Sequence, residues 1–120
     1  MTETIKPFAI GRVVLDAPII LAPMAGVCDA PYRVIAHRYG AALVCAEMVS
    51  SQGIRYSNQH TAELLHIEDG EHPLSMQIFG SDPDVMAEAA AVVEAAGADI
   101  VDINMGCPVK KVVKTAMVRL

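Results

Sequence analysis

The sequence has few aromatic residues: no tryptophan, two phenylalanines and three tyrosines among 120 residues. Its hydrophobic share is nevertheless 53%, and alanine, valine and isoleucine supply much of it. Such small and branched side chains suit helices that pack closely against parallel strands. The composition therefore excludes a disordered chain, and the length allows one domain at most.

Cysteine is also scarce, and long apolar runs are missing. The three cysteines, Cys28, Cys45 and Cys107, lie far apart and form no C-x-x-C pair, which argues against a metal or dithiol site. The longest apolar stretch, residues 17–28, is interrupted by two prolines and a glycine and is too short to span a membrane. An odd cysteine count without a secretion signal predicts a cytoplasmic protein in a reducing compartment.

Charge is unevenly distributed. The formal net charge of the whole chain is −5, with 14 acidic and 9 basic side chains. All four charged residues after position 109 are basic: Lys110, Lys111, Lys114 and Arg119. We interpret this basic end as a solvated segment, and the alternative is a patch that contacts phosphate.

Strand and helix patterns alternate roughly every 25–30 residues, which predicts parallel βα units. A doubly wound sheet is a second way to arrange such units. However, no G-x-G-x-x-G follows the first strand and the chain has no P-loop. The expected strands are residues 12–16, 18–22, 43–46, 74–79 and 100–104, and the expected helices are 29–39, 61–65 and 82–97.

Two of the expected helices have recognisable caps. Asp29 precedes the first helix, with Pro31 in its first turn, and Asp82 followed by Pro83 begins the last helix. Apolar side chains at helical spacing then predict which face of each helix is buried. We expect the inner faces to carry Val34, Ile35 and Tyr39 in the first helix and Val85, Ala89, Val92 and Ala96 in the last.

Special residues gather where the expected strands end, which is the side of an α/β barrel where chemistry takes place. Gln77 and Asn104 carry amides that either satisfy backbone groups or bind a ligand, and the residues alone leave both possibilities open. Cys107 is either a small buried side chain or a reactive thiol. The strand-end residues are 23–26, Glu47, Gln77 with Gly80, and 104–108.

Other polar and sulfur-containing side chains have simpler interpretations. Glu47 is predicted to pair with a nearby arginine, and Cys45 to act as a small buried hydrophobic residue inside a strand. Cys28 is interpreted as structural or incidental. The four histidines lack the spacing of metal ligands and are predicted to be surface or capping residues: His37, His60, His66 and His72.

Five segments of the chain are distinctive in their order and spacing. They are A-P-M-A-G at 22–26, C-D-A-P-Y-R at 28–33, A-E-M-V-S at 46–50, Q-I-F-G at 77–80 and D-I-N-M-G-C-P-V-K-K-V at 102–112. Together they resemble the bacterial branch of the tRNA-dihydrouridine synthases, over residues 10–114. The N-M-G-C-P run is the most specific part, and Cys28, where the family usually has threonine, is the one internal departure.

The resemblance implies a (β/α)8 barrel that binds FMN, followed by a small helical tRNA-binding domain, with NADPH as the reductant. Pro23, Met24 and Ala25 match the turn that lies along the flavin. Gln77 matches the side chain that hydrogen-bonds the flavin ring. The resemblance implies neither a metal nor a membrane.

The same resemblance implies that uridine in tRNA is reduced to 5,6-dihydrouridine. Cys107 matches the catalytic thiol, which would give a proton to C5 of the uracil while the flavin gives hydride to C6. Asn104 matches a residue near that base. A free thiol is mostly protonated at neutral pH, which suits a proton donor. Two alternatives stay open: a flavin-barrel oxidoreductase that acts on a small pyrimidine, and an inactive fragment.

The resemblance ends after about residue 115. The family pattern continues with Gly-x-Gly-Ser-Ala-Leu, and a single-base deletion in codons for that pattern reproduces residues 116–120, so we interpret these as frameshifted. We therefore expect residues 1–120 to form about four βα units, the N-terminal half of a truncated FMN-binding TIM barrel. The second half and the tRNA-binding domain would be absent, and open strand edges would favour self-association.

Overall fold

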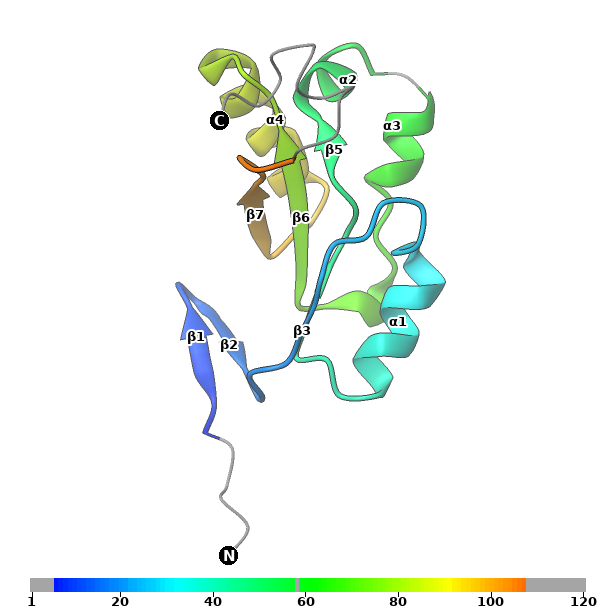
Figure 1. Cartoon of the computed structure of the whole chain (residues 1–120), viewed down its shortest axis with the longest axis vertical. Coiled ribbons are helices and arrows are strands. Elements are labelled where there is room, and N and C mark those ends of the chain that lie inside the picture. Colours follow the sequence, from blue (N-terminus) through cyan, green and yellow to red (C-terminus); the bar gives the residue numbers. More distant parts are fainter. Residues whose placement is uncertain (1–5, 58, 108–120) are drawn as a thin grey trace, which may run out of the picture.

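The computed structural model describes residues 6–57 and 59–107 (Figure 1). They form an α/β domain in which a short hairpin precedes a larger sheet. The strands are β1 (Phe8–Ile10), β2 (Val13–Leu15), β3 (Ile20–Leu21), β4 (Leu43–Cys45), β5 (Val49–Ser50), β6 (Leu74–Phe79) and β7 (Ile100–Ile103). The helices are α1 (Ala30–Arg38), α2 (Ser51–Arg55), α3 (Gln59–Leu64) and α4 (Pro83–Ala95), with a 3₁₀ turn, η1, at Asp69–Glu71.

The larger sheet is parallel and follows the order of the chain. β3 pairs with β4, β4 with the start of β6, β5 with the end of β6, and β7 with the other side of β6. β4 and β5 therefore act as one interrupted strand, and the order is β3, β4/β5, β6, β7. Sequential order is typical of a barrel wall, whereas a doubly wound sheet runs outwards in both directions from its first strands. The predicted parallel βα units are confirmed, and their arrangement is consistent with part of a barrel.

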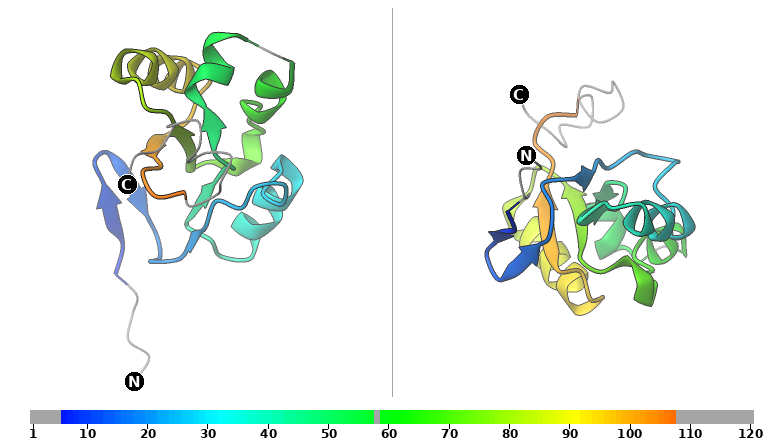
Figure 2. Two further views of the ribbon diagram at one scale, coloured as in Figure 1. Left: turned by 45° about the horizontal axis from the view of Figure 1, so that its top comes forward. Right: turned by 90° about the horizontal axis from the view of Figure 1, so that it is seen from below.

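One face of this sheet packs against the helices. Leu74, Met76 and Ile78 of β6 are fully buried and share the main hydrophobic core with Ala89 and Val93 of α4. Residues from α1, α2 and α3 join the same core, which agrees with the placement of the helices in Figure 2. Burial of this apolar face is the main contribution to the stability of the sheet.

The opposite face of the sheet carries a row of polar side chains. Side chains alternate along a strand, so Ser75 and Gln77 point away from the helices. In the register of the sheet, Cys45 pairs with Ser75 and Asp102 pairs with Gln77. Four polar or sulfur-containing residues therefore line the face that a barrel would enclose.

Helix α1 begins at its predicted cap but buries a different face. Asp29 caps the helix by accepting a backbone N–H at 2.9 Å. The predicted inner face is wrong for Ile35 and Tyr39, which are 52% and 89% exposed, while Val34 is half-buried. Arg33, only 4% exposed, lies inward instead.

Arg33 is buried because its charge is compensated inside the protein. Its Nε forms an ion pair with the fully buried Glu71 of η1, and its Nη1 donates to the carbonyl oxygen of Cys28 at 2.5 Å. A buried ion needs such a partner, since isolated burial of a charge is very costly. Glu71 lies 38 residues further along the chain, so helical periodicity alone could not indicate the pair.

Helix α4 shows a smaller rotation of its buried face. It begins at the predicted cap, where the Asp82 side chain accepts two backbone N–H groups at 2.9 and 3.1 Å. Val92 is 43% exposed and Ala96 is exposed, so both predictions are wrong. The helix packs against α2 as well as β6, which turns its inner face towards the α2 side. Its buried residues are Val85, Ala89 and Val93, with Met86 and Ala90 half-buried beside them.

Three short elements were missed by the sequence patterns: β1, β5 and α2. Strand β1 forms an antiparallel hairpin with β2, and Gly11 at its turn has a φ of 59°. The hairpin precedes β3 and lies at the end of the sheet where the strands begin (Figure 1). Each missed element has two to five residues, which is too short for a hydrophobic period to be recognised.

Gly80 at the end of β6 is required by packing. A Cβ atom at this position would lie 2.1 Å from Ser51 Oγ and 2.9 Å from Met86 Sδ. The backbone after β6 therefore passes close to α2 and α4. This finding explains the glycine of the Q-I-F-G segment without a ligand.

Candidate functional site at the carboxyl ends of the strands

Three polar side chains are joined across the ends of β6 and β7. Gln77 Nε2 donates to Asp102 Oδ2 at 2.6 Å, and Asn104 Nδ2 donates to Gln77 Oε1 at 2.9 Å. Asn104 Oδ1 accepts the backbone N–H of Gly106 at 3.0 Å. All three side chains belong to half-buried residues. The two amides are therefore held by defined partners and still have access to the open face of the sheet.

Cys107 lies at the end of this network in an apolar setting. It is 8% exposed and packs with Phe79 and Met48. Asn104 connects the thiol loop to the same cluster, because its Nδ2 also approaches Met48 Sδ at 3.6 Å. The thiol is free, so the structure places a thiol and two amides at neighbouring strand ends.

The turn after β3 forms the second part of the site. The carbonyl oxygen of Met24 accepts the N–H groups of Val27 and Cys28 at 3.1 and 3.0 Å. Pro23 and Met24 are half-buried and Ala25 is exposed. Gly26 has a φ of 73°, which a side chain would strain.

Glu47 connects this turn to the end of β4. Its Oε2 accepts the N–H of Gly26 at 3.0 Å. Among the described residues, Glu47 takes part in none of the ion pairs, so the predicted arginine partner is wrong. Because the next residue, Met48, contacts Asn104, the turn and the amide network meet at residues 47 and 48.

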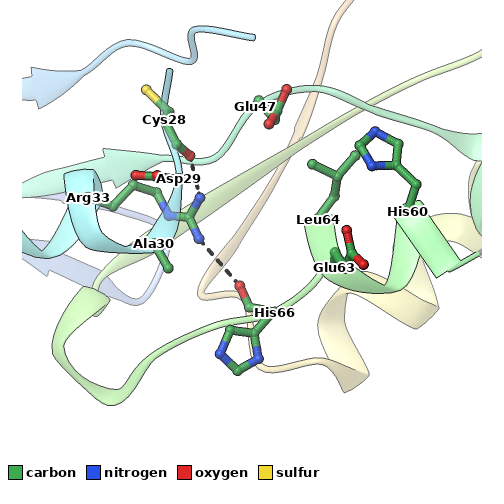
Figure 3. A pocket seen from close by; sticks show the side chains of 9 residues that line it. All are labelled: Cys28, Asp29, Ala30, Arg33, Glu47, His60, Glu63, Leu64 and His66. Carbon is green, nitrogen blue, oxygen red and sulfur yellow. Dashed lines mark hydrogen bonds between the residues drawn. The ribbon is translucent and has the colours of Figure 1, made fainter. Parts of the chain in front are cut away.

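A pocket of about 210 Å³ lies on the other side of Glu47, next to the start of α1 and to α3 (Figure 3). Arg33 donates from Nη2 to the carbonyl oxygen of His66 at 3.3 Å, in addition to its bonds with Glu71 and Cys28. This guanidinium is therefore engaged in three directions and braces α1 against η1. The pocket is lined by Cys28, Asp29, Ala30, Arg33, Glu47, His60, Glu63, Leu64 and His66.

The other two cysteines are buried, and the burial of Cys45 within a strand was predicted. Cys28 is fully buried and its Sγ donates to the carbonyl oxygen of Ala22 at 3.3 Å. Cys45 is 7% exposed. Burial raises the pKa of the Cys45 thiol, the charge of Asp102 raises it further, and a hydrogen bond with Ser75 opposes the shift. Cys45 therefore stays a neutral thiol at physiological pH.

Three of the histidines contact oxygen atoms: His37 and His66 have partners close in the sequence, whereas His72 reaches Asp99, 27 residues further on. His37 Nδ1 lies 2.5 Å from the carbonyl oxygen of Ala41, just after α1. His66 and His72 pair with Glu68 and Asp99 at 2.9 and 2.7 Å. The described part of the chain holds no group of three or more histidine, cysteine or acidic side chains arranged to bind a metal ion. None of the described helices has the length and hydropathy of a membrane span.

Two members of the network were not singled out from the sequence: Asp102 and Met48. A signal for Asp102 exists, because it stands two residues before Asn104 and alternate strand residues share a face. Met48 carries no such signal, since its position depends on the interruption between β4 and β5. Pro108 and the lysines that follow lie outside the described residues.

A family model described as dihydrouridine synthase (Dus) matches residues 20–117, which is most of the chain. The chain belongs to this family. The chain is similar to several proteins named tRNA-dihydrouridine synthase B, of which we describe three. The protein of Pseudomonas aeruginosa is 50% identical over 108 residues, that of Pseudomonas putida 48% over 108 residues, and that of Vibrio vulnificus 45% over 106 residues.

These matches cover 88–89% of this chain but only 32–33% of each relative. The chain thus spans about a third of the length of the curated relatives it matches. The family assignment confirms the resemblance noted in the five motif segments.

Proposed function

We propose that this chain forms the part of a tRNA-dihydrouridine synthase that holds FMN and the target uridine. The proposed reaction is the reduction of the C5–C6 double bond of uridine in tRNA. One observation carries the proposal: Gln77, Asn104 and Cys107 meet at adjoining strand ends in a member of the dihydrouridine synthase family. The named activity of the relatives supports a tRNA substrate.

In this proposal the larger sheet is half of the wall of a (β/α)8 barrel. Among the described residues, β3 pairs on one side with β4 and β7 pairs on one side with β6. The remaining strands of a barrel would continue from β7 and close on β3. The polar face with Gln77 and Asp102 would then point into the barrel, where its carboxyl end carries the chemistry.

The residues at the strand ends fit FMN by the chemistry of their donors and acceptors. The edge of a flavin ring needs both hydrogen-bond donors and acceptors. After its bonds to Asp102 and Asn104, the Gln77 amide keeps a second N–H and a second lone pair for a ligand. The turn of Pro23, Met24 and Ala25 would lie along the ring. When bound and reduced by NADPH, FMN supplies the hydride that uridine needs at C6.

The chain itself supplies the proton and the position of the base. Cys107 would protonate C5 of the uracil, and Phe79 and Met48 shield its thiol from bulk water. Asn104, linked to the same loop through Gly106, would hydrogen-bond the uracil. A base must leave its stack to reach such a site, which costs least in a single-stranded RNA loop.

The first test uses a completed chain, in which residues 1–107 are followed by the remaining C-terminal part of the Pseudomonas aeruginosa relative. Cys107→Ala in the completed chain is expected to lower dihydrouridine formation about 10²–10⁴-fold, the usual contribution of a general acid. FMN should stay bound, because the thiol is not among its proposed ligands. Product is measured by mass spectrometry of tRNA nucleosides, and bound FMN by absorbance.

Cys28→Thr is the matched control, because Cys28 is fully buried and donates only to a nearby carbonyl oxygen. Its hydroxyl replacement should leave turnover unchanged. Wild-type turnover in Cys107→Ala would refute the role of the thiol. Reduction of free uracil but not of tRNA would instead favour a small-pyrimidine oxidoreductase.

A further inference from the structure

The hydrogen bonds at the ends of β6 and β7 run in one direction. Gly106 N–H donates to Asn104 Oδ1, Asn104 Nδ2 donates to Gln77 Oε1, and Gln77 Nε2 donates to Asp102 Oδ2. Every link has its donor on the Gly106 side and its acceptor on the Asp102 side. The chain of bonds therefore has a polarity, like a row of aligned dipoles.

The two ends of this chain of bonds fix that polarity. The amide of Gln77 or Asn104 could in principle be turned over, because each carries an oxygen and an NH₂ group. A carboxylate only accepts, so Gln77 must present Nε2 to Asp102. A backbone N–H only donates, so Asn104 must present Oδ1 to Gly106. With both ends fixed, the central bond has one possible direction.

We propose that Asp102 is a positioning residue, which sets the orientation of the Gln77 and Asn104 amides and holds the loop of residues 104–107. This inference deepens the proposed function and rests on it for the identity of the ligands. Asp102 itself does not need to touch them. It decides which atoms remain for a ligand: one N–H and one lone pair on Gln77, and one lone pair on Asn104, whose second N–H faces Met48 Sδ.

The same network holds the loop that carries the thiol. Gly106, whose N–H is bound by Asn104, directly precedes Cys107. In the open space around Gly106 a Cβ atom would meet nothing within 4 Å, so local packing does little to fix this loop. The bonded series from Asp102 to Gly106 therefore anchors the loop beyond Asn104, whose own N–H donates to the carbonyl oxygen of Ile78 at 2.9 Å, and it acts together with the contacts of Cys107 with Phe79 and Met48.

The test compares Asp102→Asn with the wild type, both in the isolated chain of 120 residues. Asparagine has the same size but can donate, so Gln77 and Asn104 lose their single orientation. We expect the alkylation of Cys107 by iodoacetamide, followed by peptide mass spectrometry, to become about tenfold faster. This factor corresponds to the loss of one hydrogen bond to a charged group. The side-chain NH₂ signal of Gln77 in a ¹H–¹⁵N spectrum should also lose the downfield shift caused by its carboxylate partner.

Cys28 is the internal control for general unfolding, because it is fully buried and lies in the turn before α1. Cys45 is not used, since the charge of Asp102 affects its pKa.

Asp99→Asn is the matched variant, because Asp99 connects the starts of β6 and β7, at the opposite end of the strands. It should speed the alkylation of Cys28 and Cys107 by the same factor. Asp102→Glu, which keeps an acceptor-only group, should restore part of the Cys107 protection.

Equal acceleration of Cys28 and Cys107 in Asp102→Asn would overturn the proposal, because Asp102 would then only stabilise the sheet. An unchanged Cys107 rate with an unchanged Gln77 signal would overturn it as well. If the isolated chain does not protect Cys28, the same comparison is made in the completed chain. Neither readout depends on FMN or tRNA, so failure of this proposal is distinct from failure of the proposed activity.

Discussion

At the scale of single residues, the site depends on side chains that serve two partners at once. Gln77 joins Asp102 to Asn104 and, in the proposed function, also contacts the flavin. Hydrogen bonds to a charged partner contribute more than those between neutral groups. The bond that Gln77 donates to Asp102 is therefore the strongest link of the network, and the bond that Asn104 donates to Gln77 fixes the orientation of the Asn104 amide in turn.

Gln77→Leu should weaken FMN binding in the completed chain without unfolding it. Leucine has a similar size but can neither donate nor accept, so one or two ring hydrogen bonds are lost at about 0.5–1.5 kcal/mol each. We expect the FMN dissociation constant to rise by a factor between about 2, for one weak bond, and about 150, for two strong bonds, measured by fluorescence quenching on titration. Gln59→Leu is the control, because Gln59 is exposed on α3 and bonds only weakly to Glu63 at 3.4 Å. An unchanged dissociation constant in Gln77→Leu would make this amide purely structural.

The sequence is informative about the site where chemistry and strand position coincide. Gln77, Asn104 and Cys107 could be predicted as neighbours because Gln77 lies in the second half of one buried parallel strand, and Asn104 and Cys107 follow the next one. Asp102 was not singled out, because an acidic residue inside a strand indicates no particular role until its hydrogen-bond partner is known. That partner, Gln77, lies 25 residues away, and only the register of β6 and β7 brings the two together.

At the scale of elements, two aspartates connect β6 and β7, one near each end of the strands. Asp99 directly precedes β7, and Asp102 lies within it. Asp102 acts at the carboxyl end, and Asp99 acts where the strands begin. Asp99 Oδ2 accepts the Leu74 N–H at 2.7 Å and lies 2.7 Å from His72 Nδ1. Partial burial alone would raise the pKa of Asp99, but the hydrogen bonds from Leu74 and His72 together lower it.

The lowered pKa of Asp99 predicts a specific dependence of stability on pH. A carboxyl group with a folded pKa below its unfolded value of about 3.9 stabilises the fold above that value. This contribution is lost as the pH falls through the lower, folded pKa. The thermal unfolding midpoint of the wild-type chain should therefore fall more steeply below about pH 4 than that of Asp99→Asn.

Asp16→Asn is the control for this comparison, because Asp16 is exposed. It should keep the steep wild-type dependence. Midpoints are followed by circular dichroism between pH 3 and 7. Identical slopes for the wild type and Asp99→Asn would show that the bonds to Leu74 and His72 do not favour the ionised carboxyl.

The elements were predictable where a local rule decides and were not where a distant partner decides. The caps at Asp29 and Asp82 and the strand at 74–79 follow from residues within one segment. The buried face of α1 does not, because Glu71 draws Arg33 inward and leaves Tyr39 exposed. Helical spacing alone ranks a tyrosine above an arginine as a core residue, and a long-range ion pair reverses that ranking.

At the scale of the whole molecule, the larger sheet has one covered face and two open edges. In the described part of the chain, β3 and β7 are the outer strands, and both are parallel to their single neighbours. Apolar side chains are exposed on these strands: Ile20 is 45% and Ile103 is 54% exposed. Unpaired backbone groups beside exposed isoleucines are a template for pairing with another chain.

A polypeptide of these 120 residues, expressed by itself, is therefore expected to self-associate and to bind FMN weakly. Four parallel strands cannot enclose the polar face that carries Gln77 and Asp102, whereas a barrel of eight strands can. Light scattering after size exclusion, with and without added FMN, measures the association. The matched variant Ile20→Lys places a charge on the open edge and should shift the mass distribution towards the monomer. The completed chain should elute as a single species with bound flavin. A monodisperse monomer of the 120-residue polypeptide with stoichiometric FMN would show that these strands make a closed site on their own.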